Sequence, residues 1–454
     1  MIVKSILWLK DSLVAEQHMS NIDPALLDPN DKDFCLLSEE LQRRNTLIYI
    51  FSWCAIYFVG PVTYVGVMQA NIIKSFGGSD FLANLPSAVN AWVLPTPVIL
   101  AWLLTSTKYM RPMLVGSYFA LSAIGFITAA VFFTTSNTLV ISALVIHAAL
   151  TGIINGIFTM CMWEMLGRGM STRRRGKTLS IAFTIGPMFA VLGSMAASLI
   201  LTGEFLNIKI EPIERPWTYI TIYGITGPVM LLLALLSSGV TIPPREEKDE
   251  HLSFRQNFAG IKEYLGNPLI LLALFGFLLT YAGSSYIMNN VGLYVKDVTG
   301  EAPEVHTGTN LALRFGCKCA FGFILGLLMV RYNPRVPVLV TTGTCIVGII
   351  WALFVPGKWY LASFGWLGAG ELFYLYYMNY IVLFARPEQI RQYTAYTSLF
   401  PVLMGFVAGL YGFLSDKYGY RESFWLALVF LSMAMSIAIF ALPNHVKAMK
   451  RPEE

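Results

Sequence analysis

Apolar stretches long enough to cross a lipid bilayer recur along nearly the whole chain. A helix rises 1.5 Å per residue, so about 20 apolar residues cross a hydrocarbon core of about 30 Å. The pattern predicts twelve spans, near residues 46–72, 84–105, 112–134, 138–165, 178–202, 217–240, 268–295, 307–330, 337–355, 359–385, 393–414 and 424–442. The fold class that follows is an all-α polytopic membrane protein with twelve transmembrane helices.

Polar segments divide these spans into two sets of six. In the central polar segment, Phe254, Phe258 and Ile261 recur at helical spacing, which predicts an amphipathic helix on the membrane surface. We expect five parts: a cytoplasmic N-terminal tail (1–45), a first six-helix bundle (46–241), a cytoplasmic linker with the amphipathic helix (242–267), a second six-helix bundle (268–442) and a cytoplasmic tail (443–454).

Composition and charge agree with a membrane protein. The chain has 454 residues, of which 56% are hydrophobic and 13% charged, whereas soluble proteins average about 25% charged residues. Lys and Arg gather in the loops on one side, including Lys108, Arg111 and the run Arg173 to Lys177, which predicts that both termini are cytoplasmic. The net charge of +5 lies in such loops and predicts no nucleic-acid binding. No N-x-[ST] sequon occurs, which favours a bacterial inner (cell) membrane.

Two cations interrupt the eighth predicted span. Arg314 and Lys318 are four residues apart, so they share one helix face about 6 Å from each other. A lone Arg or Lys at the bilayer centre costs about 2.5–3.5 kcal/mol on insertion scales, so such residues usually have a partner or a function. The two cations predict a binding site for a carboxylate or similar anion. Alternatively, Arg314 extends to the interface and Lys318 pairs with an acid that joins two helices.

Glu371 is the one acid well inside a predicted span. It lies about 18 Å from the start of its helix and Lys318 about 16 Å from the start of its own, so the two can meet at one depth. We expect Glu371 to be a proton-coupling residue, because its protonation would release Lys318 for a negatively charged substrate. A static structural pair is the alternative. His147, in the fourth span, titrates near neutral pH and is a second coupling candidate, with a hydrogen-bonded core histidine as its alternative.

Phenol and amide side chains on three spans suit a substrate with hydroxyl groups. Tyrosines that only pack or line the membrane interface are the alternative. Besides Arg314 and Lys318, the predicted substrate-binding residues are Tyr57, Tyr64, Tyr286, Asn289, Asn290 and Tyr374. Charged residues at the ends of spans predict a cytoplasmic gate, formed by Glu164, Arg168, Arg174 and Arg331.

Several loops between spans carry short motifs. The segment from Gly326 to Arg335 follows the pattern G-x-L-x-D-R-x-G-R and has a counterpart at 101–111, but Val330 and Thr105 stand in place of the Asp. Glu164 followed by Arg173-Arg174-Arg175-Gly176 follows an E…R-R-G pattern, and the segment from Gly412 to Phe424 follows a G-x-R-x-x-F turn. With the two sets of six spans, these motifs resemble the major facilitator superfamily. The resemblance implies two pseudo-symmetric six-helix bundles, a substrate site between them and alternating access.

The leading hypothesis is a secondary transporter that moves a small organic anion, a hydroxylated carboxylate or sugar acid, by proton-coupled alternating access. Sodium in place of the proton stays open, and a monomer in the lipid bilayer is expected. A transporter of a neutral sugar or nucleoside, with the intramembrane charges as a structural network, is the main alternative. A drug exporter fits the cationic site less well, and no feature favours a non-transporting receptor. The chain carries no hydrolase, kinase or metal motif and no phosphate-binding loop, so we expect neither an enzyme nor a cofactor.

Overall fold

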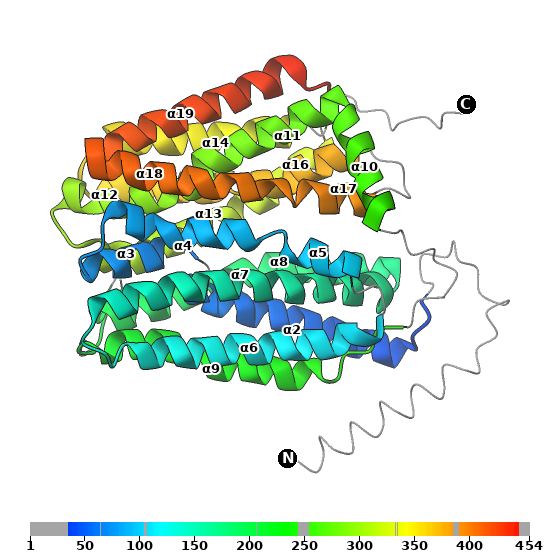
Figure 1. Cartoon of the computed structure of the whole chain (residues 1–454), viewed down its shortest axis with the longest axis horizontal. Helices are drawn as coiled ribbons and strands as arrows, with labels where there is room; N and C mark the ends of the chain where they lie inside the picture. Colours follow the sequence, from blue (N-terminus) through cyan, green and yellow to red (C-terminus); the bar gives the residue numbers. More distant parts are fainter. Residues whose placement is uncertain are drawn as a thin grey trace, which may run out of the picture.

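Long helices that run side by side make up the molecule, as the computed structural model shows (Figure 1). The structure describes residues 35–63, 65–103, 107–205, 207–243, 254–331, 333, 335–384 and 390–444, with some side chains inside these ranges left out. We call α2 to α9 the N-half and α11 to η8 the C-half. In Figure 1 the N-half lies below and the C-half above.

Each half contains six helical stretches of membrane length, and several of these stretches are divided into shorter segments. The N-half contains α2 (Glu39–Thr63), α3 (Val67–Ser75), α4 (Asp80–Val93), α5 (Thr96–Leu103), η3 (Thr107–Tyr109), α6 (Met110–Val131), α7 (Asn137–Arg168), α8 (Thr172–Thr202) and α9 (Trp217–Ser237). The helix α10 (Phe254–Gly266) follows within the predicted linker. The C-half contains α11 (Pro268–Tyr281), the π-helical η4 (Ala282–Tyr286), α12 (Met288–Thr299), α13 (Pro303–Arg331), α14 (Arg335–Phe354), η5 (Gly357–Leu361), α15 (Ala362–Gly370), α16 (Phe373–Val382), α17 (Ile390–Thr397), η7 (Phe400–Met404), α18 (Gly405–Tyr418), α19 (Tyr420–Ser436) and η8 (Ile437–Ala441).

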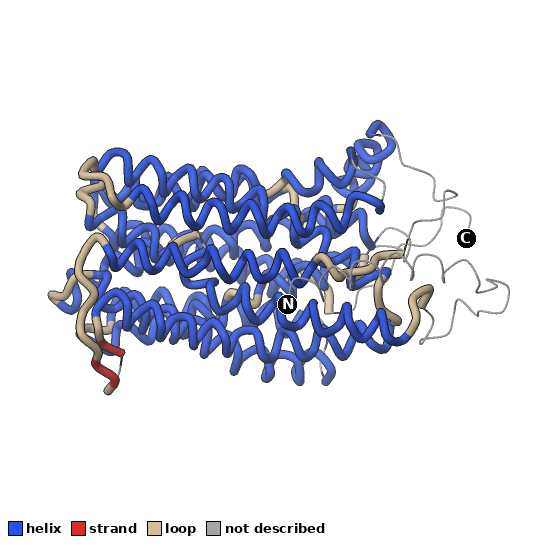
Figure 2. Tube along the Cα trace, turned by 90° about the horizontal axis from the view of Figure 1, so that it is seen from below, coloured by secondary structure: helices blue, strands red, loops and turns tan. Residues whose placement is uncertain are grey.

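The two ends of the molecule differ. One end holds the start of α2, the helix α10 and the end of α19, and we call it the linker end (Figure 1). The opposite end, the far end, holds α3 and α12 and a short hairpin of β1 (Glu204–Phe205) and β2 (Ile208–Lys209) (Figure 2). This antiparallel hairpin joins α8 to α9 and was not expected from the sequence.

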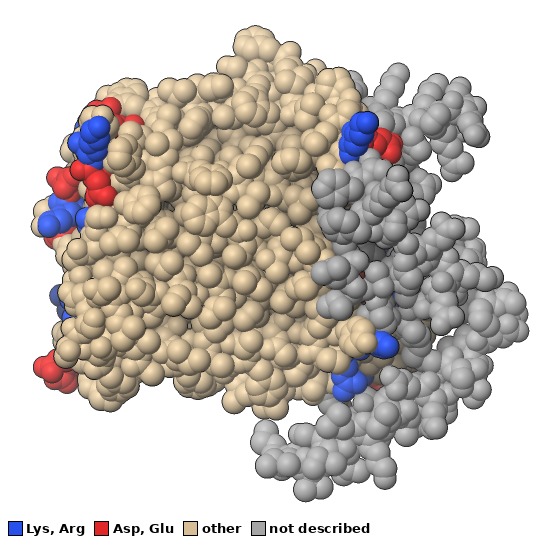
Figure 3. Space-filling view, viewed as in Figure 1, with Lys and Arg blue, Asp and Glu red and all other residues tan. Residues whose placement is uncertain are grey.

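An uncharged band crosses the middle of the face seen in Figure 3. Figure 3 shows charged residues at both ends of the visible face and none between them. Large apolar side chains are exposed along the helices, among them Phe126, Ile146 and Phe406. Nine helical stretches of the described chain are long and apolar enough to cross a membrane, and α4–α5, α13 and α15–α16 complete the twelve. The predicted all-α polytopic fold is confirmed.

The hydropathy pattern alone does not predict where some helices begin or are interrupted. The first helix begins at Glu39, seven residues before the predicted span, because its polar first turns have protein partners. Gln42 Nε2 donates to Leu37 O at 2.9 Å, and Asn45 Nδ2 donates to Thr241 O at 2.7 Å. The second span is interrupted after Val93 and the tenth at Glu371, which apolar content does not predict.

Four clusters of buried apolar side chains form the core. Two of them involve one half each, and two combine residues of both halves. One cluster around Tyr49, Leu114 and Met165 draws its described residues from the N-half alone, and one around Phe277 and Tyr377 from α10 and the C-half. The other two mix the halves. Val67 and Ala91 of the N-half join Ile287 and Phe364, and a further cluster unites Ile73, Leu311 and Phe315. Apolar packing therefore joins the halves toward the far end.

The contact between α2 and α8 depends on a missing side chain. A Cβ atom at Gly193 would lie 1.9 Å from the carbonyl oxygen of Phe58, so only glycine permits this approach. We expect Gly193→Ala to lower the free energy of unfolding by about 1–3 kcal/mol, as overpacking does. Thermal unfolding of the purified protein in detergent measures the effect. Gly116→Ala is the matched control, since a Cβ there meets no atom within 4 Å. Equal melting temperatures for the two variants would contradict this packing.

Candidate functional site

The helix α13 places the two predicted cations on one face, well away from either end of the molecule. Arg314 is the twelfth residue of α13 and Lys318 follows one turn later. Facing them, α15 ends at Gly370 and α16 begins at Phe373, so Glu371 stands at the join of two helical segments. The join keeps right-handed helical backbone, with Glu371 at φ −57° and ψ −16°. The backbone is therefore not unwound at this join.

Glu371 binds both cations, and we call these three residues the charge cluster. Arg314 Nε donates to Glu371 Oε2 at 3.0 Å, and Arg314 Nη2 donates to Oε1, so the contact is bidentate. Lys318 Nζ lies 3.4 Å from the same Oε2. The side chains of Arg314 and Glu371 are 3% and 4% exposed, whereas that of Lys318 is 23% exposed. The cluster carries a formal charge of +1 when Glu371 is ionised.

Glycine brings the two helices close enough for this contact. A Cβ at Gly368 would lie 2.2 Å from the backbone oxygen of Arg314, so α15 packs directly against the α13 backbone. Gly365 does the same beside Cys317, where a Cβ would lie 2.8 Å from Sγ. Glu371 follows Gly368 by one helical turn and therefore projects along the same interface.

The structure answers which cation is the closer partner of Glu371. The sequence pointed to Lys318 as its main partner, with Arg314 extending to the interface as an alternative. In the structure Arg314 is buried and makes the bidentate contact, while Lys318 makes one longer contact. Depth along a helix predicts that residues can meet, but rotation about the helix axis decides which of them does.

The other predicted site residues lie in several places. The ring of Tyr57 packs against Gly186, Tyr286 is buried beside Tyr281, and Tyr374 of α16 is 41% exposed. Tyr64 lies outside the described residues. Substrate contact by these tyrosines stays a prediction.

His147 is buried inside the N-half. Its Nδ1 lies 2.9 Å from Thr128 Oγ1 of α6, and its ring meets that of Tyr223 of α9 edge-on at 5.3 Å. These neighbours belong to the N-half, whereas the partners of Glu371 belong to the C-half. The structure therefore does not bring His147 into the charge cluster, and its coupling role stays a prediction.

The predicted gate residues lie at the linker end. Arg168 Nε donates to Glu164 Oε2 at 3.1 Å within α7, and Arg174 donates to Glu39 at the start of α2 at 2.9 Å. The side chain of Arg331 lies outside the described part of the structure. Gating by these residues stays a prediction.

Asn289 and Asn290 join the halves at the far end. Asn289 Nδ2 donates to Asn84 Oδ1 at 3.2 Å and to Ser87 Oγ at 2.9 Å, both on α4. Asn84 Nδ2 donates to Asn290 Oδ1 at 2.8 Å, and Asn290 Nδ2 donates in turn to Ser415 Oγ at 2.7 Å. All of these amide groups are buried. The two asparagines thus already have protein partners in the conformation described.

Asp416 strengthens the same closure. Its Oδ1 accepts the backbone N–H of Asp80 at 2.7 Å, and its Oδ2 accepts that of Phe81 at 2.9 Å. A carboxylate at the first turn of α4 interacts favourably with the helix dipole. Asp80 in turn accepts from Tyr420 at 2.6 Å and pairs with Lys74 at 2.7 Å. We call Asp80, Asn84, Asn289, Asn290 and Asp416 the far-end latch.

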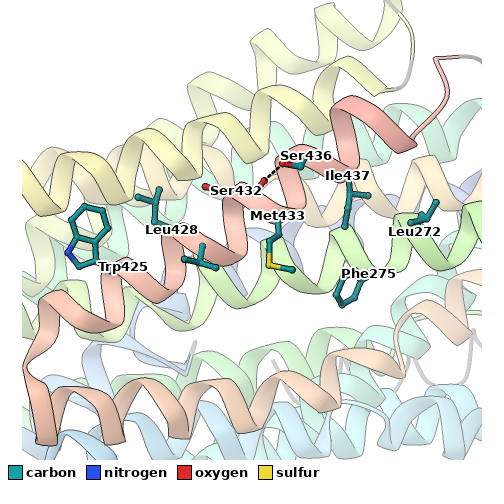
Figure 4. A pocket seen from close by; sticks show the side chains of 9 residues that line it. Leu272, Phe275, Trp425, Leu428, Ser432, Met433, Ser436 and Ile437 are labelled. Atoms are coloured by element: carbon teal, nitrogen blue, oxygen red, sulfur yellow. Dashed lines mark hydrogen bonds between the residues drawn. The ribbon is translucent and has the colours of Figure 1, made fainter.

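A metal site and an apolar groove are further candidates. Within the described residues, no group of three or more His, Cys, Asp or Glu side chains is placed to hold a metal ion. An apolar groove lies between α11 and α19, lined by residues such as Phe275, Trp425 and Met433 (Figure 4). These three side chains are exposed, and Ser436 Oγ donates to Ser432 O within α19. The groove is suited to acyl chains rather than to a polar substrate.

Sequence reasoning missed Asp416 as a contact between the halves, and it missed two buried asparagines, Asn71 and Asn310. Asp416 lies in a noted motif, but nothing in the motif names its partner on α4. Asn310 had a usable signal, since it precedes Arg314 by four residues and Lys318 by eight on one helix face.

Comparison with known proteins gives a consistent result. The family model of the Major Facilitator Superfamily matches residues 45–408. No curated protein sequence matches the chain significantly.

Solved transporters share the fold at low identity. A bacterial homologue of the human lysosomal transporter Spinster, inward-facing and occupied, is 16% identical with a TM-score of 0.64, covering 91% of this chain and 98% of its own. The nucleoside transporter NupG is 12% identical with a TM-score of 0.59, covering 88% and 97%. The transporter FucP in its outward conformation is 17% identical with a TM-score of 0.55, covering 87% and 99%. FucP is described as the fucose:proton symporter of E. coli.

The buried charge cluster generates a stability prediction. Removing one partner of a buried ion pair leaves an uncompensated charge, so Glu371→Gln should lower the free energy of unfolding by about 3–5 kcal/mol. The double variant Arg314→Met/Glu371→Met should be more stable than Glu371→Gln, because it leaves no buried charge of the bidentate pair. Thermal unfolding in detergent measures both. Lys318→Met is the control and should cost less, since Lys318 is partly exposed. The pairing would be refuted if the loss of unfolding free energy in the double variant equalled the sum of the losses in Arg314→Met and Glu371→Met.

The far-end latch generates a conformational prediction. Asp416→Asn removes the charge from two hydrogen bonds, which are worth about 1.5–3 kcal/mol each when charged. We expect a larger fraction of molecules to open at the far end. Spin labels at Phe133 and Trp359, both exposed at the far end on opposite halves, should report longer distances by pulsed electron resonance. Glu422→Gln, at an exposed acid on α19, is the control. Unchanged distances in Asp416→Asn would show that the carboxylate does not hold the halves together.

Proposed function

Because the chain belongs to the major facilitator superfamily, with the twelve-helix fold of its transporters, we propose that it is a secondary transporter that couples a small hydroxylated carboxylate to protons. The observation that carries this proposal is the buried charge cluster of Arg314, Lys318 and Glu371. A membrane protein keeps such charges where they bind ions or solutes.

The charge balance of the cluster links proton and anion. With Glu371 ionised the cluster is +1, and its carboxylate occupies both cations. Protonation of Glu371 raises the charge to +2 and frees donors on Arg314 and Lys318. A monovalent carboxylate then restores the charge to +1 and takes the place of Glu371 as hydrogen-bond acceptor. Each ligand thus favours binding of the other, and thermodynamic linkage makes this effect reciprocal. Proton and anion would move together.

The arrangement of the halves suits alternating access. The far-end latch and the mixed apolar clusters close the far end, whereas two clusters elsewhere belong to separate halves. The partly exposed Lys318 follows the buried Arg314 toward the linker end. We take the linker end to be cytoplasmic, which the gathering of Lys and Arg in its loops supports. In this proposal the described conformation faces inward, and rocking of the halves would open the latch.

A neutral cargo is the second candidate. NupG is a nucleoside transporter and FucP a fucose:proton symporter, and both share the fold. The bidentate contact between Arg314 and Glu371 would then be an internal network that responds to protons alone. Neutralising both Arg314 and Lys318 separates the candidates, since an anion carrier would lose binding whereas a carrier of neutral solutes would mainly lose stability.

Transport by Glu371→Gln tests the proton coupling. In liposomes with an imposed pH gradient, the wild-type protein should accumulate gluconate, a hydroxylated carboxylate, and Glu371→Gln should not. The variant should still exchange internal for external gluconate, because glutamine mimics the protonated acid. Radiolabelled uptake and counterflow measure the two activities, with Glu422→Gln as the control. Accumulation by Glu371→Gln under the same gradient would rule out Glu371 as the coupling residue.

A further inference from the structure

Asn310 is a fully buried amide that makes no hydrogen bond with the residues the structure describes. It is 0% exposed, and within the described residues neither its Oδ1 nor its Nδ2 finds a partner. Buried amides are almost always satisfied, since an unmade hydrogen bond is unfavourable away from water. A side chain that can both donate and accept but does neither is suited to a ligand that supplies both groups.

Asn71 provides a second unsatisfied atom across the boundary between the halves. It lies on α3 and is 2% exposed, and its Nδ2 donates to Thr307 Oγ1 of α13 at 2.7 Å. Its Oδ1 has no partner among the described residues. Thr307 precedes Asn310 by three residues, so the two lie on adjoining parts of one face of α13. Asn71 Nδ2 also lies 3.4 Å from Pro303 O, so the Asn71 amide contacts α13 from the opposite half in the turn that precedes Asn310.

This amide pair continues the charge cluster along α13. Asn310, Arg314 and Lys318 are spaced four residues apart, which places them in one row with about 6 Å between neighbours. A molecule with a carboxylate at one end and hydroxyls along its length would meet the cations first and the amides one turn further.

We propose that Asn310 and Asn71 form a hydroxyl-binding subsite, which selects polyhydroxylated carboxylates over plain ones. The inference rests on the proposed anion site and adds the group that recognises the rest of the cargo. One hydroxyl can accept from Asn310 Nδ2 and donate to one amide oxygen, and a second hydroxyl can donate to the other oxygen, so that all three unpartnered atoms gain partners. An alkyl chain would leave them unpaired, and sites that require a hydroxyl reject such analogues strongly.

The contacts of the subsite also depend on whether the far end is open or closed. Asn71 and Asn310 belong to different halves, and the contact between Asn71 and Thr307 must break when the far end opens. Opening exposes both amides to water, and closing buries them again. An empty carrier buries them unsatisfied, whereas a loaded one buries them on the cargo hydroxyls. Cargo thereby favours closure of the far end.

Binding of three probes to the purified full-length protein tests the subsite. Gluconate carries carboxylate and hydroxyls, hexanoate carries the carboxylate alone, and sorbitol carries hydroxyls alone. Isothermal calorimetry at a pH below neutrality gives each Kd. We expect the wild type to bind gluconate at least tenfold more tightly than hexanoate. Asn310→Leu, of similar volume, should weaken gluconate binding about tenfold, the loss of one hydrogen bond, and leave hexanoate binding unchanged. Asn379→Leu, at an exposed asparagine on α16, is the matched control.

The outcomes separate this subsite from the proposed function. Equal affinity of the wild type for gluconate and hexanoate, or an Asn310→Leu variant that still prefers gluconate, would overturn the subsite and leave the anion carrier standing. Binding of sorbitol but not gluconate, weakened by Asn310→Leu, would support the subsite and overturn the anion. Binding of no probe would overturn both. Melting temperatures of the empty variants show whether each is folded, and Asn310→Ser provides a second variant with a shorter polar side chain.

Discussion

The desolvated carboxylate of Glu371 is the constraint around which the C-half is arranged. A carboxylate in a membrane interior is stable only with close cationic partners, and this requirement specifies several features at once. Arg314 and Lys318 supply the partners, and the glycines of α15 let the backbone of α13 come near enough. Glu371 itself stands at the join between α15 and α16. A substitution at Gly368 would therefore affect the same contact between Arg314 and Glu371 as a substitution at Glu371 itself, because the glycine permits the approach of the two helices.

The two ends of the molecule are held by different kinds of interaction. At the far end, directional hydrogen bonds between Asn84, Asn289 and Asn290 specify one arrangement of the halves. Near the linker end, apolar clusters stabilise each half by itself. Hydrogen bonds can exchange partners with water when the halves part, whereas exposing an apolar core to water is unfavourable in proportion to its area. The far-end boundary combines such hydrogen bonds with the two mixed apolar clusters, so opening it requires both an exchange of hydrogen bonds and the exposure of apolar surface.

The sequence predicts the number, order and class of the helices because apolar length is what a bilayer requires. It also predicts that Arg314, Lys318 and Glu371 belong together, since intramembrane charges need partners. It does not predict that Arg314 is the closer partner, because rotation about the helix axis depends on packing at Gly365 and Gly368. The amides of Asn289 and Asn290 looked available for substrate because nothing local reveals that Asn84, some 200 residues away, meets them. Long-range partners of this kind come from the tertiary fold alone.

The backbone contact at Gly368 has an electrical consequence. Since α13 and α15 touch directly there, we expect Arg314 and Glu371 to move as one packed unit of the C-half when the halves rock. Their opposite charges then move together, and their combined displacement through the membrane field is nearly neutral. A membrane potential is worth about 2.3 kcal/mol per elementary charge per 100 mV. In the proposed cycle the cluster carries +1 both empty and loaded, because the charges of the proton and the carboxylate cancel. The potential would therefore act alike on the two states and would not drive net co-transport.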